Sequence, residues 1–251
     1  MLKEESGKIL SYFIKKNGNL KWLHLRNNML GEKGIKNLSE ALKNNNSIKY
    51  LNLSFNKLGN NGMVVLSEIM KNNSSITSLN VRNNGINDEG MGPFCKALES
   101  NNTIENLQLS YNNLSNKVSF SLSYFLKNNK SLKTLNLREN AINDLSIEYF
   151  CSALKTNRQL IYLDLSDNKI TTKGGEMLLS VLKENLVLRV INLENNHSLS
   201  SYVKKEIYSK LRENFQLPRK MVMLLLRRTP GNVVSKIPRR LLIYILTFIH
   251  L

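Results

Sequence analysis

Features that indicate catalysis are scarce in this sequence of 251 residues. It has three histidines, two cysteines, four prolines and one tryptophan, and 19 acidic residues stand against 36 lysines and arginines. The histidines, His24, His197 and His250, are far apart in the chain, and we find no metal-ligand spacing and no glycine-rich phosphate loop. We therefore predict that the chain is not an enzyme and uses no cofactor, no metal ion and no small-molecule substrate.

Long apolar runs are also missing. The longest apolar cluster, 241–249, has about half of the ~18 residues that a membrane helix needs, and the amino terminus has no secretory signal. Cys95 and Cys151 lie at the same helix position two repeats apart, about 16 to 20 Å from each other if neighbouring helices pack normally. That distance is too long for a disulfide, so we expect reduced thiols and a cytoplasmic protein.

The dominant feature is the pattern L-x-x-L-x-L-x-x-N-x-I, which residues 160–170 show most clearly. It recurs every 28 residues in seven copies without slippage. The first positions are Leu20, Ile48, Ile76, Ile104, Leu132, Leu160 and Leu188, and the asparagines are Asn28, Asn56, Asn84, Asn112, Asn140, Asn168 and Asn196. A fixed period of this kind is the signature of a repeat array, in which each unit is stable only when it is stacked on its neighbours.

This pattern resembles the leucine-rich repeat, and its period is similar to that of the ribonuclease-inhibitor type. The resemblance implies an α/β fold: a horseshoe-shaped solenoid with a parallel β-sheet on its concave face and helices on its convex face. The abundance of asparagine and lysine also resembles the style of leucine-rich repeat effectors of intracellular bacteria. That resemblance implies delivery into the cytosol of a host cell.

Three segments are predicted. Residues 1–19 match the second half of a repeat and are expected to form a helical cap, and residues 20–216 hold the seven repeats. The seventh repeat needs one inserted residue after Asn196 to restore the pattern. Each helix is followed by an asparagine that tolerates the left-handed conformation that ends a helix: Asn45, Asn73, Asn101, Asn129, Asn157 and Asn185. We interpret the motif asparagines as structural, because a buried amide can satisfy backbone groups as both donor and acceptor.

Residues 217–251 differ in composition, with seven basic residues, no acidic residue and two apolar clusters separated by a Pro-Gly-Asn turn. We predict a helical hairpin that caps the array. A second interpretation starts from 237–248, whose Ile-Pro, Leu-Leu, Ile and Phe positions resemble the opening helix of an F-box. The chain would then be an adaptor that recruits a ubiquitin ligase through its tail.

The residues between the inward leucines are expected to line the concave face, where repeat proteins usually bind. Trp22, Tyr50 and Phe55 are aromatic there, although Trp22 could instead pack under the amino-terminal cap. Charge is split along this face, with Arg26, Lys49 and Arg82 near the start and Glu139, Asp164, Asp167 and Glu194 near the end. The candidate partner-binding residues are Trp22, His24, Arg26, Tyr50, Phe55, Arg82, Tyr111, Arg138, Tyr162, Asp164 and Asp167.

We predict a monomeric, non-catalytic module that binds a folded protein through this face, as an inhibitor or regulator. The formal net charge of +17 leaves a third interpretation, binding to a polyanion such as nucleic acid. Basic residues do not outnumber acidic ones on the face itself, and many lysines stand at helix ends, where a cation is favourable. Both observations weigh against nucleic acid.

Overall fold

A computed structural model of the chain describes the backbone of residues 6–227 and the side chains of residues 6–216. Short strands and longer helices alternate along it. The strands are Trp22–His24 (β1), Tyr50–Asn52 (β2), Ser78–Asn80 (β3), Asn106–Gln108 (β4), Thr134–Asn136 (β5), Tyr162–Asp164 (β6) and Val190–Asn192 (β7). The helices are Ser6–Lys16 (α1), Gly31–Lys43 (α2), Gly59–Asn72 (α3), Asp88–Glu99 (α4), Ser119–Asn128 (α5), Asp144–Leu154 (α6), Thr172–Val181 (α7) and Ser201–Arg227 (α8).

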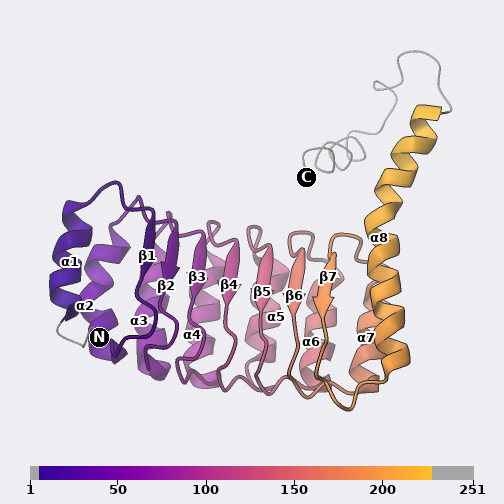
Figure 1. Cartoon of the computed structure of the whole chain (residues 1–251), viewed down its shortest axis with the longest axis horizontal. Helices are drawn as coiled ribbons and strands as arrows, with labels where there is room; N and C mark the ends of the chain where they lie inside the picture. Colours follow the sequence, from indigo (N-terminus) through magenta and orange to yellow (C-terminus); the bar gives the residue numbers. More distant parts are fainter. Residues whose placement is uncertain (1–5, 228–251) are drawn as a thin grey trace.

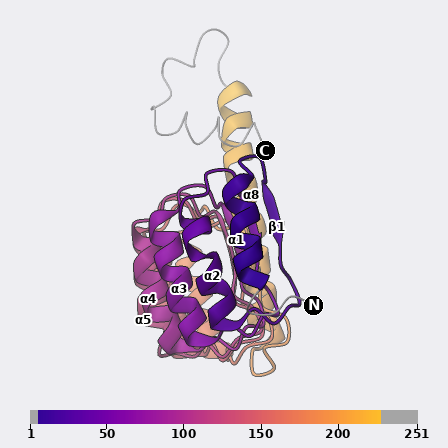
Figure 2. The same ribbon diagram turned by 90° about the vertical axis from the view of Figure 1, so that its left-hand side faces the viewer.

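The seven strands form one open parallel sheet in sequence order. Each residue pairs with the residue 28 positions later, as Leu51 pairs with Leu79 and Leu79 with Leu107. Figure 1 shows the strands side by side in one layer, and Figure 2 shows the helices stacked on one side of that layer. The α/β solenoid predicted from the repeat period is confirmed.

The core lies between these two layers. In each strand the central residue points inward, and Leu51, Leu79 and Leu107 have no exposed surface. The helices meet them with an apolar stripe of four-residue spacing, which includes Leu66 and Met70 in α3 and Phe94 and Leu98 in α4, also fully buried. Because each unit buries its apolar residues only against its neighbours, the core is a continuous line along the array.

The motif asparagines form a ladder at the turns that follow the strands, as predicted, and five of the seven are buried: Asn56, Asn84, Asn112, Asn168 and Asn196. Asn84 donates through Nδ2 to the carbonyl oxygens of Leu53, at 3.0 Å, and Arg82, at 3.2 Å. Its Oδ1 accepts from the backbone N–H groups of Asn56, at 3.0 Å, and Leu58, at 3.3 Å. One amide therefore satisfies backbone groups of two successive repeats.

The asparagines after the helices differ from the prediction. Asn73 and Asn129 have extended backbone conformations, with φ of −86° and −67°, and none of the expected set is left-handed. They form a second buried ladder instead. Asn73 Nδ2 donates to the carbonyl oxygens of Leu42, at 2.8 Å, and Asn45, at 2.9 Å, while its Oδ1 accepts from the N–H groups of Ser75 and Ile76, both at 2.8 Å. Asparagine is required there for its two-sided hydrogen bonding.

At the amino-terminal end, α1 packs against α2 and buries Ile14. The repeat alignment places Phe13 at an inward position, but its side chain is 61% exposed. No earlier helix among the described residues lies beside α1 to cover it. The assignment of residues 1–19 as a cap stays a prediction.

At the other end, the one-residue insertion in the seventh repeat is visible in the hydrogen bonds. Asn214 Nδ2 donates to the carbonyl oxygens of Leu182, at 2.8 Å, and Asn185, at 3.1 Å, 32 and 29 residues earlier. The equivalent bonds of Asn185 reach back 31 and 28 residues, to Leu154 and Asn157. The second asparagine ladder therefore continues into α8 across the insertion.

Helix α8 runs without a break through the predicted boundary between residues 216 and 217, and its last turns extend past the sheet (Figure 1). The expected second helix of the hairpin and the F-box-like stretch both lie outside the described residues. Within the described part, no helix is long and apolar enough to span a membrane.

Cys95 and Cys151 are both buried and unpaired, as predicted. Burial raises the pKa of each thiol to about 12, so very little thiolate is present near neutral pH. We expect alkylation by iodoacetamide at about pH 8 to be at least ~100-fold slower in the native protein than in urea, because reaction must wait for local opening. Mass spectrometry of quenched samples measures both rates. Equal rates would show that the thiols are accessible in the folded chain.

Candidate functional site

The candidate site lies on the face of the sheet opposite to the helix layer, which we call the sheet face, and no helix of the described residues packs over its strands (Figure 2). Trp22, in the first strand, is 64% exposed on it, so the alternative that it packs under the amino-terminal cap is wrong. Tyr50 pairs with Trp22 across β1 and β2 and is half-buried. Its ring stacks at 4.9 Å on the ring of His24. The structure thus brings three of the predicted residues together at one end of the sheet face.

Phe55 and Tyr111 lie just beyond the strands, in a left-handed turn that recurs in every repeat. The prediction of an outward strand residue at this position is wrong, because φ lies between 50° and 59° at each copy: Asn27, Phe55, Asn83, Tyr111, Glu139, Asp167 and Asn195. Asparagine and aspartate adopt this conformation easily, whereas it costs an aromatic residue about 1 to 2 kcal/mol. The two rings therefore occupy positions that local preference alone would not give them.

These rings alternate with arginines in what we call the ladder: Arg26, Phe55, Arg82, Tyr111, Arg138 and Asp167. The Arg26 and Arg82 guanidinium carbons lie 5.1 and 5.6 Å from the Phe55 ring centroid. Arg82 lies 4.1 Å and Arg138 5.8 Å from the Tyr111 centroid. Each distance is within the ~6 Å range of a cation–π interaction. The ladder crosses the repeats at the carboxyl ends of the strands.

The ladder follows from an alternation with a period of two repeats. The seventh motif position holds arginine in the first, third and fifth repeats (Arg26, Arg82 and Arg138), serine in the second, fourth and sixth, and Glu194 in the seventh. The serines, Ser54, Ser110 and Ser166, are only 2% exposed. A small serine leaves space beside each long arginine. All members of the ladder were predicted as candidate binding residues, but their alternation was not. The 56-residue spacing of the three arginines is the signal in the sequence that could have revealed it.

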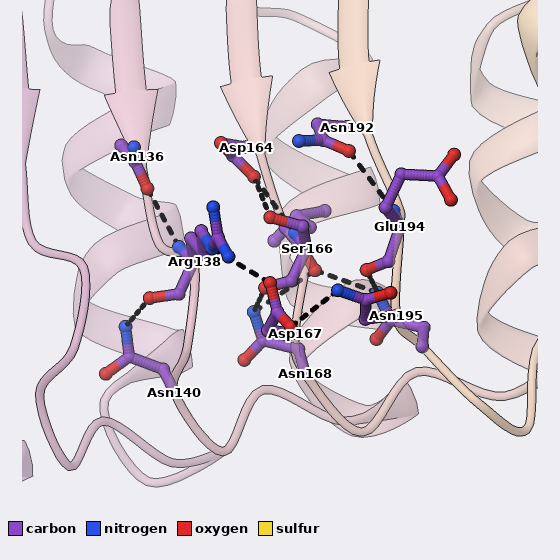
Figure 3. Close-up of polar contacts among 12 residues, drawn as sticks. Asn136, Arg138, Asn140, Asp164, Ser166, Asp167, Asn168, Asn192, Glu194 and Asn195 are labelled. Carbon is purple, nitrogen blue, oxygen red and sulfur yellow. Dashed lines mark hydrogen bonds and ion pairs between the residues drawn. The ribbon is translucent and has the colours of Figure 1, made fainter.

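The last member of the ladder, Asp167, is acidic and pairs with the arginine before it. Arg138 Nε lies 2.8 Å from Asp167 Oδ2, in an ion pair whose N–H is not aligned for a hydrogen bond. Asn195 Nδ2 donates to the other oxygen, Oδ1, at 2.8 Å (Figure 3). Arg82 Nε is likewise buried and without a hydrogen-bond partner, and Arg82 has no ion pair among the described residues. Arg82 and Arg138 occupy equivalent positions, but only Arg138 is paired with a carboxylate of the described residues.

Asp164 belongs to the framework and not to the exposed surface that the sequence suggested. It is 5% exposed, and its Oδ1 accepts from the Ser166 N–H at 3.0 Å and from the Ser166 hydroxyl at 2.6 Å. The Tyr162 hydroxyl donates to Oδ2 at 3.3 Å. Burial, together with the negative charge of Asp164, raises the pKa of Tyr162. Asp164 is therefore too enclosed to meet a partner directly.

Glu194 is also neutralised within the chain. Lys204, from α8, lies 2.8 Å from one carboxylate oxygen, and the Tyr208 hydroxyl donates to the other at 3.1 Å. These contacts lower the pKa of Glu194, with the Lys204 hydrogen bond as the main cause. The acidic end of the sheet face thus has internal partners for Asp164, Asp167 and Glu194, while the structure describes no carboxylate partner for Arg26 or Arg82.

A mostly apolar groove of about 700 Å³ lies between β7 and α8. Tyr162 and Val190 line it from the sheet, and Tyr208, Leu211 and Phe215 line it from the helix. Of the residues that line this groove, only Tyr162 was among the predicted partner-binding residues. The others were missed because the repeat pattern does not predict how α8 lies against the last strand.

The described residues include no group of three or more His, Cys, Asp or Glu side chains that could hold a metal ion. His24 is exposed and stacked on Tyr50, and His197 is exposed in the loop after β7. The arrangement of aromatic rings, guanidinium groups and amides on the sheet face suits binding.

The family described as Leucine Rich repeat matches residues 44–67, 72–95, 128–151 and 156–179. A solved structure titled "Leiomodin-1 Actin-Binding Site 2 (ABS2)" is similar, with a TM-score of 0.57 and 25% sequence identity, over 67% of this chain and 96% of that one. The tropomodulin carboxyl-terminal domain from Caenorhabditis elegans matches at 13% identity and a TM-score of 0.38, over 88% of this chain and 99% of that one. No curated protein sequence matches the chain.

Proposed function

The chain is a leucine-rich repeat protein, and from this premise we propose that it is a non-catalytic interaction module whose sheet face binds a folded protein. The observation that carries the proposal is the exposed aromatic and arginine side chains of that face. Trp22 is 64% exposed and is the only tryptophan in the chain. Tryptophan, tyrosine and arginine dominate the binding energy of protein interfaces.

The geometry of the sheet also suits a protein partner. Seven strands about 4.8 Å apart span about 30 Å, which is enough for an interface of standard size. The backbone of the sheet is fixed by the two asparagine ladders, so it does not need to be ordered on binding. A pre-organised surface of this kind loses little conformational entropy when it associates.

The similar structure is that of an actin-binding site of leiomodin-1, which supports a protein as the class of partner. Actin itself is one candidate partner. We further propose that the chain acts as a stoichiometric inhibitor or regulator, by occupying its partner's surface. Its free, buried cysteines are consistent with the cytoplasmic location that we propose.

Photo-crosslinking from matched positions tests the proposal. A benzoyl-phenylalanine replaces Trp22 on the sheet face in one variant and Phe120, on helix α5, in the other. The two native side chains are 64% and 62% exposed, so the probes are comparably accessible. We expect the Trp22 probe to crosslink a discrete protein from a cell lysate, or purified actin, and the Phe120 probe to give none of that product. Crosslinking from Phe120 alone would place the binding surface on the helices and refute the proposal.

A further inference from the structure

The two ends of the sheet face differ in how their charges are satisfied. The strand segments of the first three repeats, 20–28, 48–56 and 76–84, hold Lys21, Arg26, Lys49 and Arg82 and no acidic residue. Lys21, Arg26 and Lys49 are exposed, and Arg82 is half-buried. This half of the face thus presents positive charge that the described part of the chain does not neutralise.

The ladder itself supplies an example of what such an arginine binds. Arg138 lies against the Tyr111 ring and is paired with the Asp167 carboxylate at 2.8 Å. Asp167 stands at the motif position that Phe55 and Tyr111 occupy in earlier repeats. Arg82 lies between those two rings, with a buried Nε that has no partner among the described residues. Arg82 is half-buried, and its guanidinium charge has no carboxylate beside it among the described residues, so this site favours a carboxylate from outside the chain.

We propose that the part of the ladder formed by Arg26, Phe55, Arg82 and Tyr111 is the docking site for an acidic, extended segment of the protein partner. This inference rests on the proposed function of the sheet face and specifies the chemistry of the partner. The carboxylates of the segment bind the guanidinium groups of Arg26 and Arg82. The Phe55 and Tyr111 rings hold those groups in place by stacking, which limits the side-chain entropy lost on binding.

The spacing of the arginines restricts the conformation of the segment. They stand two strands apart, and with parallel strands about 4.8 Å apart the separation is about 10 Å. A polyproline II helix has three residues per turn and rises about 3.1 Å per residue, so acidic residues at every third position lie about 9 Å apart on one side. A segment of that kind, lying across the strands, places successive carboxylates on Arg26 and Arg82.

The probe that tests this inference is a Pro-Pro-Glu repeat peptide of about twelve residues. Its controls are the Pro-Pro-Gln peptide and a peptide of equal composition with the glutamates contiguous. Binding is followed through the arginine Nε–H signals in nuclear magnetic resonance spectra of the full chain. We expect the Arg26 and Arg82 signals to shift with the Pro-Pro-Glu peptide and the Arg138 signal to move least, because Asp167 already occupies it. Shifts spread equally over all arginines would overturn the assignment.

Two sets of variants make the test specific. The R26Q/R82Q variant is expected to bind the peptide about tenfold more weakly, whereas K127Q/K183Q, with the same change in net charge at two helix ends, keeps its affinity. The D167N variant retains an amide that suits the left-handed turn, but it frees Arg138. We expect it to bind the peptide about threefold more tightly, since a third guanidinium becomes available. Equal affinity of R26Q/R82Q and the wild type would refute the inference.

Other outcomes separate this inference from the proposed function. If a single-stranded oligothymidylate binds the ladder more tightly than the peptide does, the site accepts phosphates and the carboxylate assignment is wrong. If the Trp22 probe crosslinks a protein but the peptide shifts neither Arg26 nor Arg82, the function of the sheet face stands and the ladder assignment is wrong. If crosslinking occurs only from Phe120, the proposed function fails whatever the peptide does.

Discussion

Replacing Asn73 by alanine is expected to lower the free energy of unfolding by about 3 to 5 kcal/mol. The Asn73 side chain is 3% exposed and serves four backbone groups: the carbonyl oxygens of Leu42 and Asn45 and the N–H groups of Ser75 and Ile76. Alanine removes all four hydrogen bonds and leaves those groups buried without their partner. Urea denaturation followed by far-UV circular dichroism measures the loss.

The neighbouring residue provides a matched control. Asn72 is exposed, and its one described side-chain hydrogen bond runs within its own helix, to the Glu68 carbonyl oxygen at 2.8 Å. Asn72→Ala is expected to change stability by less than about 0.5 kcal/mol. Hydrogen exchange should show the amides of Ser75 and Ile76 losing protection in Asn73→Ala alone. Similar stability of the two variants would mean that the second asparagine ladder does not hold the repeats together.

Replacing Trp22, Tyr50 and Phe55 together by alanine is expected to weaken binding to the crosslinked partner at least ~100-fold. Trp22 supplies exposed aromatic area, Tyr50 stacks on His24, and Phe55 holds two guanidinium groups. The variant therefore loses direct contacts and part of the positioning of Arg26 and Arg82. Isothermal titration calorimetry measures the affinity.

A second set of three aromatic residues on the helices serves as the control. Phe120 and Tyr149 are in edge-to-face contact at 6.0 Å, and Tyr124 is 49% exposed. Replacing these three by alanine is expected to leave the affinity within a factor of about two. Far-UV spectra and melting temperatures of both variants should stay close to those of the wild type. If the sheet-face variant unfolds, Trp22, Tyr50 and Phe55 stabilise the fold, and their assignment to the binding surface is wrong.

Much of the fold could be predicted from the sequence because the repeat is strictly periodic. The 28-residue step alone fixes the strand register, since each strand pairs with the equivalent residues of the next repeat. The burial of the leucines and the first asparagine ladder, which includes Asn84, follow from the same pattern. The prediction failed for the asparagines that follow the helices. A local preference for left-handed turns suggested their role, but hydrogen bonds to residues 28 and 31 positions earlier decide it.

The candidate site was predictable only in part. Position in the motif was enough to place Trp22 on an exposed face, because strand residues alternate between the two sides of a sheet. Burial of Asp164 could not be foreseen, since it depends on the neighbouring Ser166 and Tyr162 side chains. The groove beside β7 was missed for a similar reason: it exists only because α8 packs next to the last strand.

The repeat, the order and register of the strands and the residues available on the sheet face can therefore all be predicted from the amino-acid sequence. These depend on periodicity and on the alternation of a strand, both of which are local. The stacking of the repeats, in contrast, places Phe55 and Tyr111 in left-handed turns between Arg26, Arg82 and Arg138. It also brings Asp167 to the last of these arginines, whose charge it neutralises. Those contacts join residues 27 to 29 positions apart, which become neighbours only when the repeats stack.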